Sequence, residues 1–441
     1  MIMNNKYVLK ILILFVFLAI CGVYSTAMAK VYIDIDAPGF QQFPIAICDF
    51  QNKKTGTSAS SDVNSAIADD IKNYLDMTGI FKILDKKSFL EGVEPGYPEK
   101  IRFPEWTAIG ADFLVRGDLT VQGKDTVADS RLYDVARGEM LFNKRYSDAG
   151  GNTKALALAI ARDILMALTG DAGDFNTKIA FIIKRKTGSD IYSMNYDASG
   201  MGNMTGHQSI VTSPRWSPDG QYLAFTSYKK GRPQVYLRNL KTGSERTVAS
   251  FEGLNLCGSF SPDSKKLLLT LSKDGNEDIY VLDINTMQLK RLTNSYSIDV
   301  SPTWSPDGQK IAFVSNRSGS PQIFVMNADG GNARRITFNG KYNTSPSWSP
   351  RGGKIAYEGL AGGRYQIFTV DEGGGNLMQM TSDNADNEYP SWSPSGRQIV
   401  FSSRQGGRSR ICIMNVNGMK TRVLFESASH LVMPSWSPSL K

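Results

Sequence analysis

Apolar residues recur at a constant interval through the second half of the chain. One aromatic position repeats every 44 residues and is occupied by Trp216, Phe260, Trp304, Trp348, Trp392 and Trp436. Three more series keep the same step: Ile179, Leu223, Leu267, Ile311, Ile355 and Ile399; Ile191, Val235, Ile279, Ile323, Ile367 and Ile411; and, more weakly, Met204, Val248, Leu292, Ile336, Met380 and Leu424. Gly, Asn and Asp separate these runs. Each repeat therefore predicts four short β-strands joined by turns.

A repeat of about 40 to 50 residues with four strands is typical of a β-propeller blade. A single four-stranded sheet cannot bury both of its faces, whereas blades stacked around an axis can. We therefore expect an all-β six-bladed propeller over residues 173–441, with each repeat aromatic at the contact between blades. The Ser-Pro-Asp-Gly sequence, or a close variant, follows each aromatic and predicts a tight turn into the next strand.

The order of the strands predicts how this ring closes. The first repeat begins near Lys178 with no aromatic strand ahead of it, and the last repeat supplies only the strand around Trp436. The C-terminal strand is therefore expected to complete the first blade. Ser439 and Leu440 stand where Asp and Gly would be, which fits a position after which no strand follows. The alternative, an open solenoid, would leave two unpaired sheet edges.

Residues 30–172 lack the repeat and predict an α/β domain with a mixed sheet. Strands are expected at 43–50, 80–85, 111–123, 126–135 and 139–146, and helices at 62–77, capped by Asp62, and at 153–169. Residues 170–178 are expected to link this domain to the propeller. Ahead of it, residues 30–38 alternate apolar and polar side chains, which predicts a strand-like N-terminal arm.

The first 29 residues differ from the rest. Lys6 and Lys10, a short apolar run and the final Ala-Met-Ala predict a secretory signal peptide, cleaved after Ala29. A membrane anchor is the alternative, but the run is shorter than the roughly 20 residues that span a bilayer; a lipoprotein attached at Cys21 is another. Cleavage would lower the formal charge from the +8 of the whole chain by the two lysines.

Composition narrows the class of protein further. Hydrophobic residues make up 41% and charged residues 21% of the chain, which excludes a disordered chain and a membrane bundle. The mild basic excess of an exported protein does not indicate nucleic acid as a partner. Cys48, Cys257 and Cys412 remain after cleavage, and their odd number and wide spacing predict buried thiols and no disulfide framework.

The sequence carries no motif for catalysis. It has no G-x-S-x-G, Walker loop, H-E-x-x-H or Cys-x-x-Cys. Its two histidines, His207 and His430, fall in loops of adjacent repeats across the closure, so a shared metal site is conceivable. Ordinary capping or exposed histidines are favoured, because ligand sets need a convergent cluster. We therefore expect no enzyme, no metal and no cofactor.

These features resemble the TolB family, the periplasmic component of the Tol-Pal envelope system. The resemblance rests on the signal, "KVYIDID", "GADFLVRGDLT", "YDVARGEML" and the W-S-P-D-G repeats, and it covers nearly the whole chain. It implies a monomeric, non-enzymatic adaptor in the periplasm that is only peripheral to membranes and supports outer-membrane integrity and cell division. The repeat motif alone is shared with peptidase propellers. A secreted hydrolase or peptidase is therefore one alternative. A carbohydrate- or cation-binding propeller is another, which a ring of acids at equivalent positions would favour, but the repeats show none.

The resemblance also implies two partners. The N-terminal arm would bind a TolA-like inner-membrane protein through Lys30, Val31, Tyr32, Ile33, Asp34, Ile35 and Asp36. An alternating strand can add to a partner's sheet, or it can be an edge strand of its own domain. The loops before the aromatic strands would bind a Pal-like, peptidoglycan-associated lipoprotein, and the candidate contacts there are Leu254, Asn255, Cys257, Asp299, Val300, Tyr342, Asn343, Asn387, Glu388 and His430.

Overall fold

The structure is a computed structural model that describes residues 40–52, 61–90, 100–122 and 125–440. The expected signal peptide and the strand-like arm both lie outside these residues. Within the described ranges, no helix has both the length and the apolar character that crossing a membrane requires.

The N-terminal part is built on one mixed sheet, as predicted. Its strand order is β3-β1-β4-β5-β6, and β2 also pairs with β4. Strand β1 runs parallel to β3 and to β4, whereas β4, β5 and β6 form an antiparallel meander. The strands are β1 (Phe43–Ile47), β2 (Gln51–Asn52), β3 (Phe81–Ile83), β4 (Phe113–Gln122), β5 (Asp125–Asp134) and β6 (Glu139–Asp148).

Two long helices cover one face of this sheet. Helix α2 (Ser61–Met77) and helix α4 (Thr153–Thr169) bury Ile71 and Ile160 in one apolar core with the sheet. Helix α4 has the predicted bounds and ends at Gly170, whose φ of 74° suits a glycine. Helix α2 begins at Ser61, so Asp62 lies inside its first turn and the prediction that Asp62 caps the helix was wrong.

Two short helical segments were not predicted from the sequence. Helix α3 (Phe103–Ala108) buries Trp106 against the other face of the sheet, and a 3₁₀ turn covers Lys86–Ser88. Helix α3 is too short to show an apolar period, which is why the sequence pattern did not predict it.

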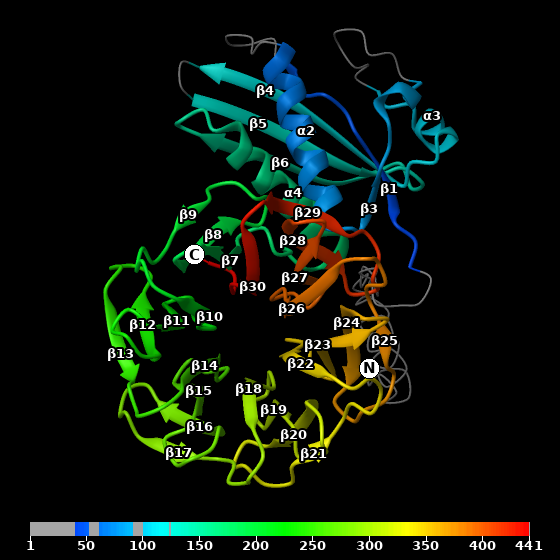
Figure 1. Cartoon of the computed structure of the whole chain (residues 1–441). Coiled ribbons are helices and arrows are strands. Elements are labelled where there is room, and N and C mark those ends of the chain that lie inside the picture. The colour runs from blue at the N-terminus through cyan, green and yellow to red at the C-terminus, as the bar shows by residue number, and fades with distance from the viewer. Residues whose placement is uncertain (1–39, 53–60, 91–99, 123–124, 441) are drawn as a thin grey trace, which may run out of the picture.

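The rest of the chain forms six four-stranded sheets arranged around a central axis (Figure 1). Blade 1 contains β30 (His430–Trp436), β7 (Lys178–Arg185), β8 (Gly188–Asn195) and β9 (Gly202–Asn203). Blade 2 contains β10 (Val211–Trp216), β11 (Tyr222–Ser227), β12 (Gln234–Asn239) and β13 (Glu245–Ala249). Blade 3 contains β14 (Asn255–Phe260), β15 (Lys266–Leu271), β16 (Asp278–Asp283) and β17 (Leu289–Arg291). The first strand of each blade lies nearest the axis, and the fourth lies at the rim.

The other three blades repeat this plan. Blade 4 contains β18 (Asp299–Trp304), β19 (Lys310–Ser315), β20 (Gln322–Asn327) and β21 (Arg334–Arg335). Blade 5 contains β22 (Asn343–Trp348), β23 (Lys354–Ala361), β24 (Arg364–Asp371) and β25 (Met378–Gln379). Blade 6 contains β26 (Asp386–Trp392), β27 (Gln398–Gln405), β28 (Arg408–Asn415) and β29 (Arg422–Ser427). The predicted number of blades is therefore confirmed.

The repeat aromatics lie between blades, as predicted. Trp348 of blade 5 packs with Ile323 of blade 4, and Trp392 of blade 6 packs with Ile367 of blade 5. Some also bond across the contact, since the indole N–H of Trp216 donates to the Ser435 carbonyl of blade 1 at 3.0 Å. The 44-residue period is therefore the period of the contact between blades.

The fourth strand of four blades has only two or three residues. Strands β9, β21 and β25 have two residues each, and Leu292 and Ile336 of the fourth series lie just beyond their strands. A threonine side chain then continues the pairing. The Thr337 hydroxyl accepts from the Ile323 amide and donates to Gln322, and Thr205, Thr293 and Thr381 accept from the amides of Ile191, Ile279 and Ile367 in the same way.

The C-terminal strand completes the first blade, which confirms the predicted closure. Strand β30 pairs antiparallel with β7, with Trp436 opposite Ile179. Beyond the strand, the Leu440 amide donates to the Asn176 carbonyl at 2.8 Å. Because the last strand pairs with β7, blade 1 gains the first strand that the other blades have and β7 is not left as an open edge.

Candidate partner-binding face

The two faces of the ring carry different loops. Because the strands of each blade are antiparallel, the turns between first and second strands open on one face together with the turns between third and fourth strands. The loops between second and third strands, and those that lead into the next blade, open on the other face. We call this second face the mouth face. It holds all the loops that the sequence analysis selected for partner binding.

The α/β domain is fixed to the opposite face of the ring. The Tyr196 hydroxyl, just after β8, donates to the Met77 carbonyl at 2.9 Å, and the Gln398 amide donates to the same carbonyl at 2.8 Å. Asp76, at the end of α2, forms ion pairs with Lys420 and Arg422. These contacts lie over blades 1 and 6 and leave the mouth face uncovered by the α/β domain.

The segment between the two domains is also held in place. The Asp174 carboxylate is buried and accepts from the Ser395 amide at 3.0 Å and from the Ser395 hydroxyl at 2.6 Å. Burial raises the pKa of Asp174, and the bonds from Ser395 oppose that shift. The expected linker at 170–178 is thus part of the packed interface between the domains.

Half of the candidate contacts for the Pal-like partner are interior residues. Asn255, Cys257, Asp299, Asn343 and Asn387 are each 6% exposed or less. Four of them, Asn255, Asp299, Asn343 and Asn387, occupy the same position of the repeat at the start of the first strand. Each forms a hydrogen bond with the residue four positions earlier. The Asn343 amide, for example, donates to the Asn339 carbonyl and to Gln322 Oε1, both at 2.8 Å. These side chains therefore hold the loops of the mouth face in shape.

Asp299 and Cys257 are both interior residues, one in an ion pair and the other an uncharged thiol. The Asp299 carboxylate accepts from Arg317 Nη2 at 2.8 Å and 3.0 Å, which fixes the adjoining hairpin. Burial raises the pKa of the Cys257 thiol to about 12, so this side chain stays neutral and unreactive at ordinary pH.

The other candidates lie closer to solvent. Tyr342 is 38% exposed, while Leu254, Val300, Glu388 and His430 are partly buried. Burial lowers the pKa of His430, and the charges of Lys184 and Arg404 lower it further, so this imidazole is neutral at physiological pH. Tyr342 is the candidate with the most surface available for a partner.

Exposed apolar residues on the mouth face were missed by the sequence analysis. Phe338 is 67% exposed, Tyr296 is fully exposed, and Ile298 and Leu360 also project from these loops. Tyr342 packs edge-on against Tyr365 with ring centroids 5.9 Å apart, and its carbonyl accepts from the Leu360 amide at 3.0 Å. We call Phe338, Tyr342 and Leu360 the blade-5 patch. These residues could have been identified from the sequence, because each is an apolar residue in or beside a loop between two predicted strands.

Two carboxyl groups lie beside this patch. Glu358 is buried and accepts from the Thr344 hydroxyl at 2.6 Å and from the Tyr389 amide at 2.7 Å. Burial, followed by the charges of Glu358 and Asp386, raises the pKa of Glu388 to about 7. The charge of the mouth face therefore changes near neutral pH.

Ser227 and Glu245 of blade 2, with His207 from the loop that leads into this blade, have the outline of a hydrolytic triad. His207 Nδ1 lies 3.0 Å from Ser227 Oγ, and His207 Nε2 lies 2.9 Å from Glu245 Oε2. Ser227 has no exposed surface, and Glu245 also pairs with Lys229 and Arg238. A nucleophile must reach its substrate, so this arrangement is a structural network. Throughout the described residues, no group of three or more His, Cys, Asp or Glu is placed to hold a metal ion.

The fold and this face define a two-domain propeller protein, with an α/β domain on one side of a closed ring and uncovered loops on the other. Two family models match the chain: the TolB beta propeller domain at residues 165–440 and the TolB amino-terminal domain at residues 31–141. The chain therefore belongs to the TolB family, as the resemblance indicated.

Individual relatives agree with this assignment. The chain is similar to the Tol-Pal system protein TolB of Syntrophus aciditrophicus, with 45% identity over 55% of each chain, and to that of Desulfosudis oleivorans, with 38% identity over 50% of each chain. The matched part of the chain thus spans about half the length of these curated relatives. The crystal structure of TolB from Acinetobacter baumannii is similar over 90% of this chain and 97% of that one, with a TM-score of 0.78 and 29% identity.

Proposed function

We propose that this protein is a non-enzymatic adaptor of the Tol-Pal system in the periplasm. It binds a Pal-like, peptidoglycan-associated lipoprotein through the mouth face and a TolA-like inner-membrane protein through the arm at residues 30–38. In this role it supports outer-membrane integrity and cell division. The observation that carries the proposal is the group of exposed apolar side chains on the ring face that the α/β domain leaves free.

The chemistry of the mouth face suits a protein partner. Aromatic side chains are enriched at protein interfaces, and Tyr is common among the residues whose truncation costs most binding energy. The blade-5 patch and the neighbouring Tyr296 offer such side chains on loops that the buried Asn343 and Asp299 hold in shape. A face with preformed loops loses little conformational entropy when it binds.

The proposal of a non-enzymatic role has support from the channel as well. The residues that line it are mainly serines, prolines and aromatics, without a carboxylate or a histidine among the described lining residues. A hydroxyl without a neighbouring base is a weak nucleophile. The assignment to the Tol-Pal system rests on the similarity to relatives that are Tol-Pal system proteins.

Capture from envelope extracts tests the proposal. Four proteins are compared: the chain from residue 30, the same chain without residues 30–38, a mouth-face variant with Phe338→Ser, Tyr342→Ser and Leu360→Ser, and an opposite-face control. The control carries Met287→Ser, Met378→Ser and Met419→Ser, three exposed residues in or beside the loops of the other face. Captured proteins are identified by mass spectrometry.

Each variant has its own expected result. Deletion of the arm should abolish capture of the TolA-like protein and leave the Pal-like protein bound. The mouth-face variant should do the reverse, and the control should capture both. Capture of both partners by all four proteins would overturn the assignment of the two surfaces, and capture of neither by the intact chain would overturn the adaptor role.

A further inference from the structure

The central channel has a regular lining made by the first strand of every blade. In each of these strands the pairing with the second strand shifts by a β-bulge, as between Thr212 and Arg215. The bulge places Ser213, Ser301 and Ser345 at φ values of 53° to 56°. Bulges redirect side chains, and here they bring short hydroxyl side chains to the channel wall.

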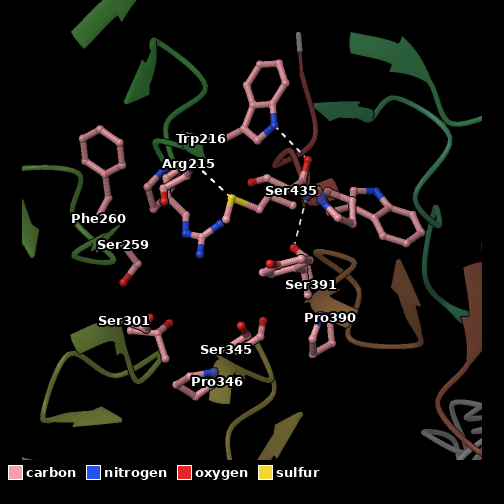
Figure 2. Close-up of a pocket in the computed structure, with 18 residues that line it drawn as sticks. Arg215, Trp216, Ser259, Phe260, Ser301, Ser345, Pro346, Pro390, Ser391 and Ser435 are labelled. Carbon is pink, nitrogen blue, oxygen red and sulfur yellow. Dashed lines mark hydrogen bonds between the residues drawn. The ribbon is translucent and has the colours of Figure 1, made fainter. Parts of the chain in front are cut away.

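One charged side chain stands in this lining. Arg215 points into the pocket that Ser259, Ser301 and Ser345 surround (Figure 2). The remaining blades carry Ser or Thr at the position of Arg215, namely Ser259, Thr303, Ser347, Ser391 and Ser435. The sixfold ring thus has a single cationic position, which makes the lining asymmetric in charge.

The described residues give Arg215 no anionic partner. The hydrogen bond found for its side chain runs from Nη1 to the carbonyl of the adjacent Pro214, at 3.1 Å. No Asp or Glu belongs to the pocket lining. Burial lowers the pKa of Arg215, and the Cys257 thiol, itself neutral, is the group that opposes this shift. A guanidinium in such a place retains most of its five donors for a ligand.

The space around Arg215 selects for a small ligand. The pocket has a volume of about 220 Å³, and a water molecule in the liquid takes about 30 Å³. A tetrahedral or carboxylate anion with a few waters fits this space, whereas a folded domain does not. The hydroxyls of Ser301 and Ser345 can donate to the oxygens that the guanidinium does not reach.

We propose that the channel binds a small oxyanion on Arg215, with the serine hydroxyls of the neighbouring blades completing the site. A planar guanidinium donates two parallel N–H bonds to a phosphate, sulfate or carboxylate, and the bonds are strong because both partners are charged. The anion offsets a positive charge that the confined channel solvates poorly. The lining residues are not among the candidate partner contacts, so the proposal does not depend on the proposed adaptor role.

Titration calorimetry at constant ionic strength tests the site. The full chain from residue 30 is titrated with phosphate, sulfate, acetate or chloride. The Arg215→Gln variant removes the charge, Arg215→Lys keeps the charge without the planar fork, and Arg232→Gln removes an exposed arginine elsewhere as a matched control. Tryptophan fluorescence, to which Trp216 and Trp436 of the same pocket contribute, gives a second readout of occupancy.

The expected result is saturable binding of one phosphate or sulfate per chain. Affinity should fall by at least about tenfold in Arg215→Gln, fall less in Arg215→Lys and stay unchanged in Arg232→Gln. Preference for acetate over phosphate would identify a carboxylate as the ligand type. If Arg215→Gln does not fold, the double change Ser301→Ala with Ser345→Ala should still weaken binding by several-fold. Absence of saturable binding, or equal binding by Arg215→Gln, would overturn the proposal.

Discussion

Trp436 donates its indole N–H to the Thr177 hydroxyl at 2.8 Å, which ties the last strand of the chain to the residue before the first strand of the propeller. Trp436 also donates its amide to the Ser391 hydroxyl of blade 6 at 3.1 Å. One residue therefore joins the C-terminal strand, the start of blade 1 and the neighbouring blade. Trp436 and Thr177 are 259 residues apart in the sequence, so the ring is closed by a contact between its two ends.

Truncation of Trp436 should destabilise the whole ring. Trp436→Ala removes a large buried side chain and is expected to lower the free energy of unfolding by about 3 to 5 kcal/mol. Trp436→Phe keeps most of the packing and loses the hydrogen bond, so about 1 kcal/mol is expected. Urea denaturation gives both values, and hydrogen exchange reports whether β30 and β7 open first. Equal protection of these strands in Trp436→Ala and the parent would contradict the role of Trp436 in closure.

The stability of the protein should depend on pH through Glu388. Its pKa is about 7 in the folded chain against an ordinary value of 4.5, so the folded state holds the proton over that interval. The stabilisation of the folded state by this bound proton is fully present below pH 4.5 and is lost as the pH rises through 7. Replacing Glu388 with Gln should reduce the fall in unfolding free energy across this interval by about 1 to 3 kcal/mol. Denaturation curves at several pH values measure it, and an unchanged pH profile in the variant would contradict the raised pKa.

The thiols of Cys257 and Cys412 should be unreactive in the folded protein. Burial raises the pKa of each to about 12, and the thiolate is the form that reacts. At about pH 8 a thiol reagent such as Ellman's reagent should leave both unmodified, and the same reagent should modify them at once in denaturant. Peptide mapping after reaction identifies each site. Rapid modification of Cys257 in the native protein would mean that the channel wall opens.

Ser227 should not act as a nucleophile despite its distance of 3.0 Å from His207. A fluorophosphonate probe needs an exposed, activated serine, and Ser227 has no exposed surface. We expect no labelling of Ser227, and a cost of about 1 kcal/mol in stability for Ser227→Ala because a buried bond is lost. Labelling that disappears in Ser227→Ala would show that blade 2 carries a hydrolytic site and would contradict the non-enzymatic reading.

The blade number and the closure could be predicted from the sequence because packing repeats with the chain. Trp304, Trp348 and Trp392 keep a spacing of 44 residues because each fills the same gap between blades. Strand β30 around Trp436 supplies the first strand that the repeat beginning at Lys178 lacks. In a propeller each sequence repeat forms one blade that packs on its neighbours, so the period of the sequence predicts the arrangement of the blades.

The position of the α/β domain could not be predicted. Its placement depends on the bonds of Tyr196 and Gln398 to the Met77 carbonyl, which join positions 119 and 321 residues apart and follow no period. A sequence pattern reports burial along one element, whereas a contact between domains requires two surfaces to be known at once.

The sequence could not fully distinguish residues that contact a partner from residues that hold the loops in shape. Asn255, Asn343 and Tyr342 all lie where the loops enter the first strands, and sequence alone does not tell an asparagine that holds a loop from one that faces a partner. The repeat offered one clue that was not used: Asn255, Asp299, Asn343 and Asn387 recur at the period of the fold, as structural residues do. Phe338 and Arg215 have no counterpart of the same type in the other repeats. The exposed Phe338 supports the proposed partner-binding face, and Arg215 supports the proposed anion site.

Calorimetric titration with the purified periplasmic domain of a Pal-like lipoprotein tests the central claim most directly. The parent chain and the opposite-face control should bind it with the same affinity, whereas the variant with Phe338→Ser, Tyr342→Ser and Leu360→Ser should bind at least about a hundredfold more weakly, because aromatic anchors in an interface cost about 2 kcal/mol or more when truncated. Circular dichroism and the unfolding midpoint should match among the three proteins. Undiminished binding by the mouth-face variant, with loss of binding in the opposite-face control, would contradict the account.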